Sequence, residues 1–412
     1  KIAIQTMRRH SNSQEPLSGE DLKYDARALT LFISAVFEER IPHEVNVLIP
    51  HINRPFQKGL EINNRRIRCI VKNWDSDFIR VDIDQDADEE EYLVRLKDEE
   101  NHIDHTYLWD LLKEGMQLNL LDCQVKQPII TPRLIVVEPD YLVDISSIAT
   151  CFTAFGHHPL LYLLNLMKPR ANTQATLLGN FAGAALDDII NTNGKYQMNE
   201  TIKTNFREKA LEFCTCPWFD AKKFYTDANL QAFNLQQVVD ILFPRTASQA
   251  KMSAFRGESL YDRKKAILEP SFVCEALGIQ GRVDLMTTDC KLLVEQKSGR
   301  NMNIETHQVD PAYHSYQLEP HYVQLLLYYG VLQHNFKLSN DRVNIRLLYS
   351  KYRPQDGLMV VAYYQKLFKE AIQYRNQLVA ASFEIAKVGF EHTLNEFTPE
   401  VLNVAGTQDF FY

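Results

Sequence analysis

Short apolar runs separated by polar residues fill the chain between residues 66 and 137. There are five such runs, at 66–71, 78–83, 92–96, 117–121 and 134–137. Strands of this length and spacing are typical of small barrels and sandwiches. We therefore predict a small β-barrel-like domain over residues 55–143.

Helical spacing marks the chain on either side of this region. Residues 22–40 carry apolar side chains at helical spacing, and the pattern ends at Pro42, which predicts an N-terminal helical segment over residues 1–54. From residue 144 to residue 412 helical and strand-like patterns alternate. The predicted helices lie at 160–167, 177–188 and 360–389, and a buried strand lies at 345–350.

Two apolar runs, 283–286 and 291–295, are joined by a polar turn and predict a β-hairpin. Because neighbouring strands lie about 4.8 Å apart, Asp284 lies close enough to Glu295 for a single cation to contact both carboxylates. Lys297 lies on the same face of its strand as Glu295. Two carboxylates that close repel each other unless a proton or a metal ion compensates. Hard oxygen ligands beside a lysine suit Mg²⁺ or Mn²⁺, with substrate phosphate completing the coordination. The alternative is a solvated hairpin with an ordinary ion pair.

Further motifs lie on both sides of this hairpin. Glu269 lies upstream, and the run Gly-Arg-Val-Asp at 281–284 leads into the hairpin. Downstream, His321, Gln324 and Tyr328 fall on one stripe of a predicted helix. Together the motifs are more specific than any one of them.

In this order the motifs resemble the nuclease domain of the PD-(D/E)XK superfamily, in its RecB-like branch. That branch includes replication-type helicase–nucleases and CRISPR-adaptation nucleases, and the resemblance covers residues 144–375. It implies a restriction-endonuclease-like α/β core, with a mixed central sheet flanked by helices, over residues 144–412.

The resemblance also implies roles for the hairpin residues. Asp284 and Glu295 would hold one or two Mg²⁺ or Mn²⁺ ions, together with the main-chain carbonyl oxygen of Gln296. Lys297 would orient the attacking water or stabilise phosphate oxygens. Glu269 would serve a metal-bound water or a second ion.

Substrate contacts follow from the same resemblance and from local charge. Gln324 and Tyr328 would position the strand, and Arg282, Ser298 and Arg300 would bind its phosphates. The net charge of −8 argues against a general polyanion binder, so basic groups near the site have to supply these contacts. The alternative is solvated surface charge.

One position departs from the family pattern. The family begins a helix with Gly-x-x-x-His, and that histidine binds the metal, whereas here Gly179 is followed by Gly183. Asp187 lies one turn further along the same face and would substitute, directly or through water. The alternative is that these small residues let the helix pack closely against the sheet.

Two charged stretches of the barrel-like domain allow more than one interpretation. Residues 63–74 mix basic and aromatic side chains, as a DNA-binding strand does, but a charged strand edge explains them equally well. The acidic run 84–91 lacks the glycine and glutamate of an EF-hand loop and is interpreted as a solvated turn.

Several chemistries are not expected. Seven scattered cysteines suit a reducing cytoplasm, and because none follows Cys290, the four thiolates of the family's iron–sulfur cluster cannot be assembled. No P-loop motif occurs, so we expect no ATP site in this chain. No apolar run approaches the roughly 20 residues that cross a bilayer, so we expect no membrane contact.

The function predicted from the sequence is metal-dependent hydrolysis of DNA, single-stranded or flapped rather than intact duplex. The resemblance implies the nuclease part of a repair, replication or recombination helicase–nuclease, with the motor beyond Tyr412 or on another chain. A first alternative is a catalytically weakened nuclease fold used for DNA binding or docking. A second is an interaction protein with a chance motif, in which the four predicted catalytic residues do not converge.

Overall fold

A computed structural model shows two compact units, which divide between Ile135 and Val136. The structure describes residues 66–83, 91–154, 156–167, 172–192, 195–336, 338, 343–389, 391, 392 and 395. The predicted helical segment 1–54 and most of the acidic run 84–91 lie outside these residues. The sequence predicts the domain boundary after Val143, whereas the two units divide at Ile135, within the last strand of the first unit's sheet.

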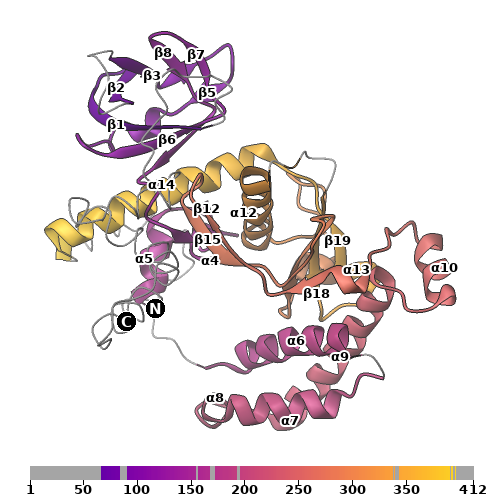
Figure 1. Ribbon diagram of the computed structural model, residues 1–412. Helices are drawn as coiled ribbons and strands as arrows, with labels where there is room; N and C mark the ends of the chain where they lie inside the picture. Colours follow the sequence, from indigo (N-terminus) through magenta and orange to yellow (C-terminus); the bar gives the residue numbers. More distant parts are fainter. Residues whose placement is uncertain are drawn as a thin grey trace, which may run out of the picture. The chain divides into compact units, whose positions relative to one another are not determined.

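The first unit is built on a seven-stranded sheet of order β7-β8-β3-β2-β1-β6-β9 (Figure 1). Its strands are β1 (Arg66–Trp74), β2 (Phe78–Asp82), β3 (Tyr92–Arg95), β6 (Gln117–Leu121), β7 (Gln124–Lys126), β8 (Ile129–Thr131) and β9 (Leu134–Val137). Side chains alternate along β1, so that Ile67, Cys69 and Val71 are buried. Among the described strands the two edges, β7 and β9, do not pair with each other, so the sheet stays open and forms no closed barrel.

Two basic side chains of the proposed DNA surface on β1 have partners on neighbouring strands. Arg68 donates through Nε to Gln117 Oε1 at 3.1 Å, and Lys72 forms an ion pair with Asp82 at 3.3 Å. These contacts favour the interpretation of β1 as a charged strand.

The second unit contains a five-stranded mixed sheet of order β13-β16-β17-β18-β19. Its strands are β13 (Ala266–Leu268), β16 (Leu285–Thr287), β17 (Leu292–Lys297), β18 (Asn344–Tyr349) and β19 (Leu358–Val360). Of the pairings in this sheet, β17–β18 is parallel and the others are antiparallel. The predicted hairpin is therefore present as β16 and β17, with Leu285 opposite Val294.

A smaller three-stranded sheet continues this one at β13 and β16. It has the order β10-β15-β14, with β10 (Val143–Asp144), β14 (Ser271–Cys274) and β15 (Ile279–Arg282). The chain passes from one sheet to the other twice, at 269–270 and at 283–284. Two of the predicted acidic residues, Glu269 and Asp284, lie at these crossings.

Helices cover both faces of the five-stranded sheet (Figure 1). On one face lie α6 (Gln174–Asn191) and α9 (Ala221–Leu242), which share a core with Leu292 and Val294 of β17. Each begins at a side-chain cap, because Thr173 accepts from the Thr176 N–H and Asp220 accepts from the Lys223 N–H. Three further helices complete this region, namely α7 (Met198–Glu208), α8 (Ala210–Cys214) and α10 (Ala247–Phe255).

The other face carries α12 (Glu319–Phe336), which contacts β17, β18 and α14 (Gln365–Val388). Most of α12 is buried on all sides, as expected for a helix without a polar face. Around it lie α4 (Ile145–Ala149) and α5 (Leu160–Met167), and two short helices, α11 (Met302–Thr306) and α13 (Pro354–Gly357), follow the ends of β17 and β18. None of the helices in the described ranges is long and apolar enough to span a membrane.

An ion cluster fixes the start of α12. His157 on β12 (Gly156–His157) lies 2.7 Å from a carboxylate oxygen of Glu319 and 2.7 Å from one of Glu370. Hydrogen bonds to Glu319 and Glu370 raise the pKa of His157 to about 9, so the ring is cationic at neutral pH. The cluster ties β12 to α12 and α14, and so holds the helix that carries Gln324 and Tyr328.

Candidate active site

Glu269 and Asp284 are neighbours at the crossings between the two sheets. The Glu269 N–H donates to the Asp284 carbonyl oxygen at 2.9 Å. Regular pairing is interrupted here, between the pairs Leu268–Leu285 and Ser271–Arg282. Glu269 has a φ of 49°, in the left-handed region that a residue with a Cβ rarely adopts, so its backbone is strained where it meets Asp284.

Strand β17 brings the remaining predicted catalytic groups to Asp284. The Gln296 N–H donates to Asp284 Oδ2 at 2.5 Å. Lys297 Nζ lies 2.7 Å from Glu295 Oε1, and the Glu295 side chain is only 6% exposed. The second oxygen of that carboxylate, Oε2, is buried without a hydrogen-bond partner among the described residues. A buried acceptor in this state is costly, and a bound cation or a proton would satisfy it.

The pKa values show how closely the carboxylates interact. Burial, and after it the Asp284 carboxylate, raise the pKa of Glu295 to about 7 against the opposing effect of Lys297. Burial also raises the pKa of Asp284, although the Gln296 N–H and Lys297 oppose it. Perturbed carboxylates of this kind are typical of functional sites.

Asp187 approaches the same group from helix α6. Burial raises its pKa to about 7, and Glu269 and Asp284 are the next largest causes. One turn earlier on α6, Gly183 has no atom within 4 Å of the position that a Cβ would occupy. The position where the family pattern has histidine is thus open rather than packed.

Helix α12 closes the site from the other face of the sheet. Tyr328 Oη donates to the Arg282 carbonyl oxygen at 2.6 Å, and a Cβ on Gly281 would lie 2.9 Å from the Tyr328 ring. Gly281 is therefore required for this ring to reach β15. Gln324 Oε1 is buried without a hydrogen-bond partner in the described part of the chain, which leaves it available as an acceptor.

A buried hydrogen-bond network supports β17 on the side of α9, and the sequence patterns do not predict it. Gln296 Nε2 donates to Ser350 Oγ at 2.6 Å, and Ser350 Oγ donates to Gln231 Oε1 at 2.5 Å. Gln231 Nε2 in turn donates to the Ser298 carbonyl oxygen at 3.0 Å. The only trace of this network in the sequence is a polar residue on an otherwise apolar helix face. Such a residue does not identify its distant partners.

The three predicted phosphate-binding residues have partners within the protein. Arg282 forms an ion pair with Glu269 at 2.9 Å, and Arg300 forms one with Glu305. Ser298 lies against α6, because its Oγ is 3.2 Å from the position of a Cβ on Gly179. Arg282 and Arg300 are mostly exposed, so a polyanion can reach them only in competition with these carboxylates.

The donor set fits a divalent ion with few protein ligands. Within the described ranges, no three side chains of Asp, Glu, His or Cys come together closely enough to hold a metal ion. Glu269 is paired with Arg282, and its membership, with Asp187, of one ligand set around Asp284 and Glu295 stays a prediction. Mg²⁺ is commonly held by one or two carboxylates plus water and substrate phosphate, and Asp284 with Glu295 suits that mode.

Comparisons with protein-family models and with curated proteins gave no match to this chain.

The affinity for Mn²⁺ is expected to depend on pH through Glu295. A metal ligand must be deprotonated, and the pKa of this carboxylate is raised to about 7. The affinity should therefore rise about tenfold between pH 6 and pH 8 and level off above that. Calorimetric titration across this range measures it, and the Glu295→Gln variant should lose the dependence. A flat profile for the wild-type protein would exclude Glu295 as a ligand.

Proposed function

We propose that the chain is a metal-dependent deoxyribonuclease of the PD-(D/E)XK superfamily, in the RecB-like branch, with a restriction-endonuclease-like core. The observation that carries this proposal is the meeting of Asp284 and Glu295 beside Lys297, with one buried carboxylate oxygen unpaired among the described residues. A chance motif in an interaction protein gives no reason for these side chains to converge.

The reaction is hydrolysis of a phosphodiester bond. Asp284 and Glu295 would hold one or two Mg²⁺ or Mn²⁺ ions, with the Gln296 carbonyl oxygen as a further ligand. When bound, such an ion lowers the pKa of the attacking water and neutralises charge on the phosphate. Lys297 donates to the phosphate oxygens or orients the water, and its ion pair with Glu295 fixes its ammonium at the site.

The residues around this centre orient the substrate. Tyr328 braces β15 through its hydrogen bond to Arg282, and the buried acceptor of Gln324 would contact the strand. His321 lies 2.9 Å from Tyr349 Oη, and burial, then Lys297, lower its pKa to about 3, so it is a neutral ring. The neutral ring therefore adds no second positive charge beside Lys297.

We propose that the protein acts in the cytoplasm on single-stranded or flapped DNA, together with a helicase module. Seven free thiols suit a reducing compartment.

The test of the activity is cleavage of oligonucleotides labelled at the 5′ or the 3′ end, with Mg²⁺, Mn²⁺ or EDTA. The proposal expects metal-dependent products, and their lengths give the polarity. Intact oligonucleotides under every metal condition would contradict it.

A weakened nuclease fold that serves for DNA binding or docking is the second candidate. It is favoured by glycine at position 183 and by the lack of three converging side-chain ligands in the described part of the chain. Under this alternative the protein binds the oligonucleotides without cutting them.

Restoring the histidine of the family pattern is expected to strengthen metal binding. Gly183 lies in a helix with open space at its Cβ position, so Gly183→His should fold without strain. An added imidazole ligand should raise Mn²⁺ affinity about tenfold, or about 1.4 kcal/mol. The matched control is Gly183→Ala, which also removes the glycine from the helix but adds no ligand. Equal Mn²⁺ affinities of these two variants would show that position 183 does not face the site.

A further inference from the structure

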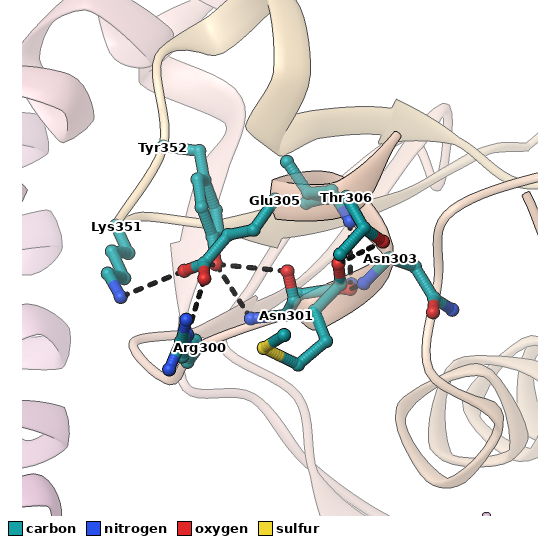
Figure 2. A network of polar contacts seen from close by, with 9 residues as sticks. Arg300, Asn301, Asn303, Glu305, Thr306, Lys351 and Tyr352 are labelled. Carbon is teal, nitrogen blue, oxygen red and sulfur yellow. Dashed lines mark hydrogen bonds and ion pairs between the residues drawn. The ribbon is translucent and has the colours of Figure 1, made fainter. Parts of the chain in front are cut away.

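Directly beyond β17, basic side chains and a tyrosine hydroxyl surround a carboxylate of the chain itself (Figure 2). Arg300, Lys351 and Tyr352 surround Glu305, and we call these four residues the Glu305 cradle. Lys351 Nζ lies 3.2 Å from Glu305 Oε1, and Tyr352 Oη donates to the same oxygen at 2.8 Å. The Arg300 Nε pairs with the other carboxylate oxygen.

The cradle rests on a fixed support. Asn301 is fully buried, and its N–H donates to Tyr352 Oη at 2.7 Å. The Asn301 side chain caps α11 by accepting from the Asn303 N–H at 2.9 Å, and it donates to the Tyr316 carbonyl oxygen. Tyr352 is therefore held in place by main-chain contacts whether or not Glu305 is bound.

The cradle lies next to the candidate active site. Strands β17 and β18 are parallel, with Lys297 opposite Tyr349, so both strands end at the same edge of the sheet. Arg300 and Lys351 follow these ends directly. Three residues span at most about 10 Å, so Arg300 remains close to Lys297.

The chemistry of the cradle suits an oxyanion with more than two acceptor oxygens. A guanidinium, an ammonium and a hydroxyl supply charge-assisted donors from three directions, whereas a carboxylate has only two oxygens to accept them. The Arg300 side chain is 62% exposed and the Lys351 side chain 39%, so a ligand has access to both cations. Exposed ion pairs of this kind are weak, and an incoming anion can replace them.

We propose that the Glu305 cradle binds a phosphate group of a nucleic-acid strand, and that Glu305 occupies it until that phosphate displaces its carboxylate. The proposal rests on the proposed function, because the strand is the one whose scissile bond lies at Lys297. Hydrogen bonds from Arg300, then from Tyr352, lower the pKa of Glu305 to about 2. Protonation therefore does not release Glu305 at neutral pH, and a competing anion is required.

Fluorescence anisotropy of a labelled single-stranded DNA oligonucleotide, with the full chain in EDTA at low salt, tests this. Glu305→Gln should bind the oligonucleotide about fivefold more tightly than the wild type, because the competing charge is removed. The salt dependence of log K should steepen by about 0.7, the slope expected for one more phosphate contact on a single strand. Replacing Arg300 as well, in Glu305→Gln/Arg300→Gln, should cancel both effects.

The matched control is Glu200→Gln, which changes the net charge equally but lies in an exposed ion pair with Lys203 on α7. Equal affinities of Glu305→Gln and Glu200→Gln would overturn the proposal. It would also be overturned if inorganic phosphate saturated Glu305→Gln in calorimetry while the oligonucleotide affinity stayed at the control value, because the cradle would then take a free anion. Near-identical circular dichroism and melting curves for these variants establish that each is folded.

The outcome is separable from that of the proposed function. Binding is measured in EDTA, so it does not require cleavage. If the protein never cuts DNA but Glu305→Gln binds it more tightly, the cradle proposal stands and the nuclease proposal fails. If cleavage needs Asp284 but Glu305→Gln does not change binding, the nuclease proposal stands and the cradle proposal fails.

Discussion

Cleavage of a labelled oligonucleotide in Mn²⁺ is expected to fall by a factor of about 10² to 10³ when Lys297 is replaced by methionine. The Lys297 ammonium lies 2.7 Å from Glu295 at the edge of β17, where it can donate to a phosphate. Asp284→Asn should abolish cleavage, because a neutral amide is a poor ligand for a hard divalent ion. Both changes keep the size of the side chain, so the Gln296 N–H to Asp284 hydrogen bond can be retained in part.

Two control variants lie on the same hairpin. Asp289→Asn removes a carboxylate that pairs with Lys265 at 3.1 Å in the turn, and Lys291→Met removes an exposed lysine. Each should cleave within about twofold of the wild type, since surface changes of this kind have small effects. Wild-type cleavage by the Asp284 or the Lys297 variant would exclude this site, provided that circular dichroism shows all four proteins to be folded.

The largest loss of stability is expected at Arg375. This arginine is fully buried on α14, and its guanidinium donates to four main-chain carbonyl oxygens. These belong to Val137, Glu138, Tyr141 and Gly278. Arg375→Met would leave those acceptors unsatisfied inside the second unit, which should lower the free energy of unfolding by about 4 kcal/mol.

Denaturant titration measures this loss. Arg207→Met serves as the control, because Arg207 is exposed on α7, and it should change stability by less than about 0.5 kcal/mol. Arg375→Lys should lose nearly as much as Arg375→Met, since one ammonium cannot reach four carbonyl oxygens in a planar fork. If Arg375→Met lowered the free energy of unfolding no more than Arg207→Met does, water would have to replace the guanidinium at these carbonyl oxygens.

Local patterns in the sequence are sufficient for the elements that carry the proposed chemistry. The hairpin of β16 and β17 follows from two apolar runs and a polar turn, and α12 follows from a long apolar stretch that includes Gln324 and Tyr328. The mixed sheet flanked by helices is confirmed. A closed barrel in the smaller domain is not confirmed. Strands β7 and β8 have only three residues each, and so short a hydrophobic pattern does not predict which strands pair.

Features made by distant residues could not be predicted in this way. Helix α9 carries buried Gln231 and Asn234, whose partners near Ser298 and Ser350 lie far along the chain. The Glu305 cradle joins Glu305 to Lys351, 46 residues later. Arg300 and Arg282 were predicted from their position to bind phosphate, but which carboxylate each of them meets is decided by tertiary packing.

Calorimetric titration of Mn²⁺ into metal-free protein tests most directly whether Asp284 and Glu295 form a metal site. The wild type should bind the ion and release protons near neutral pH, and the double variant Asp284→Asn/Glu295→Gln should show no saturable binding. Asp289→Asn should bind as the wild type does. Equal Mn²⁺ affinity of the wild type and the double variant would contradict the account.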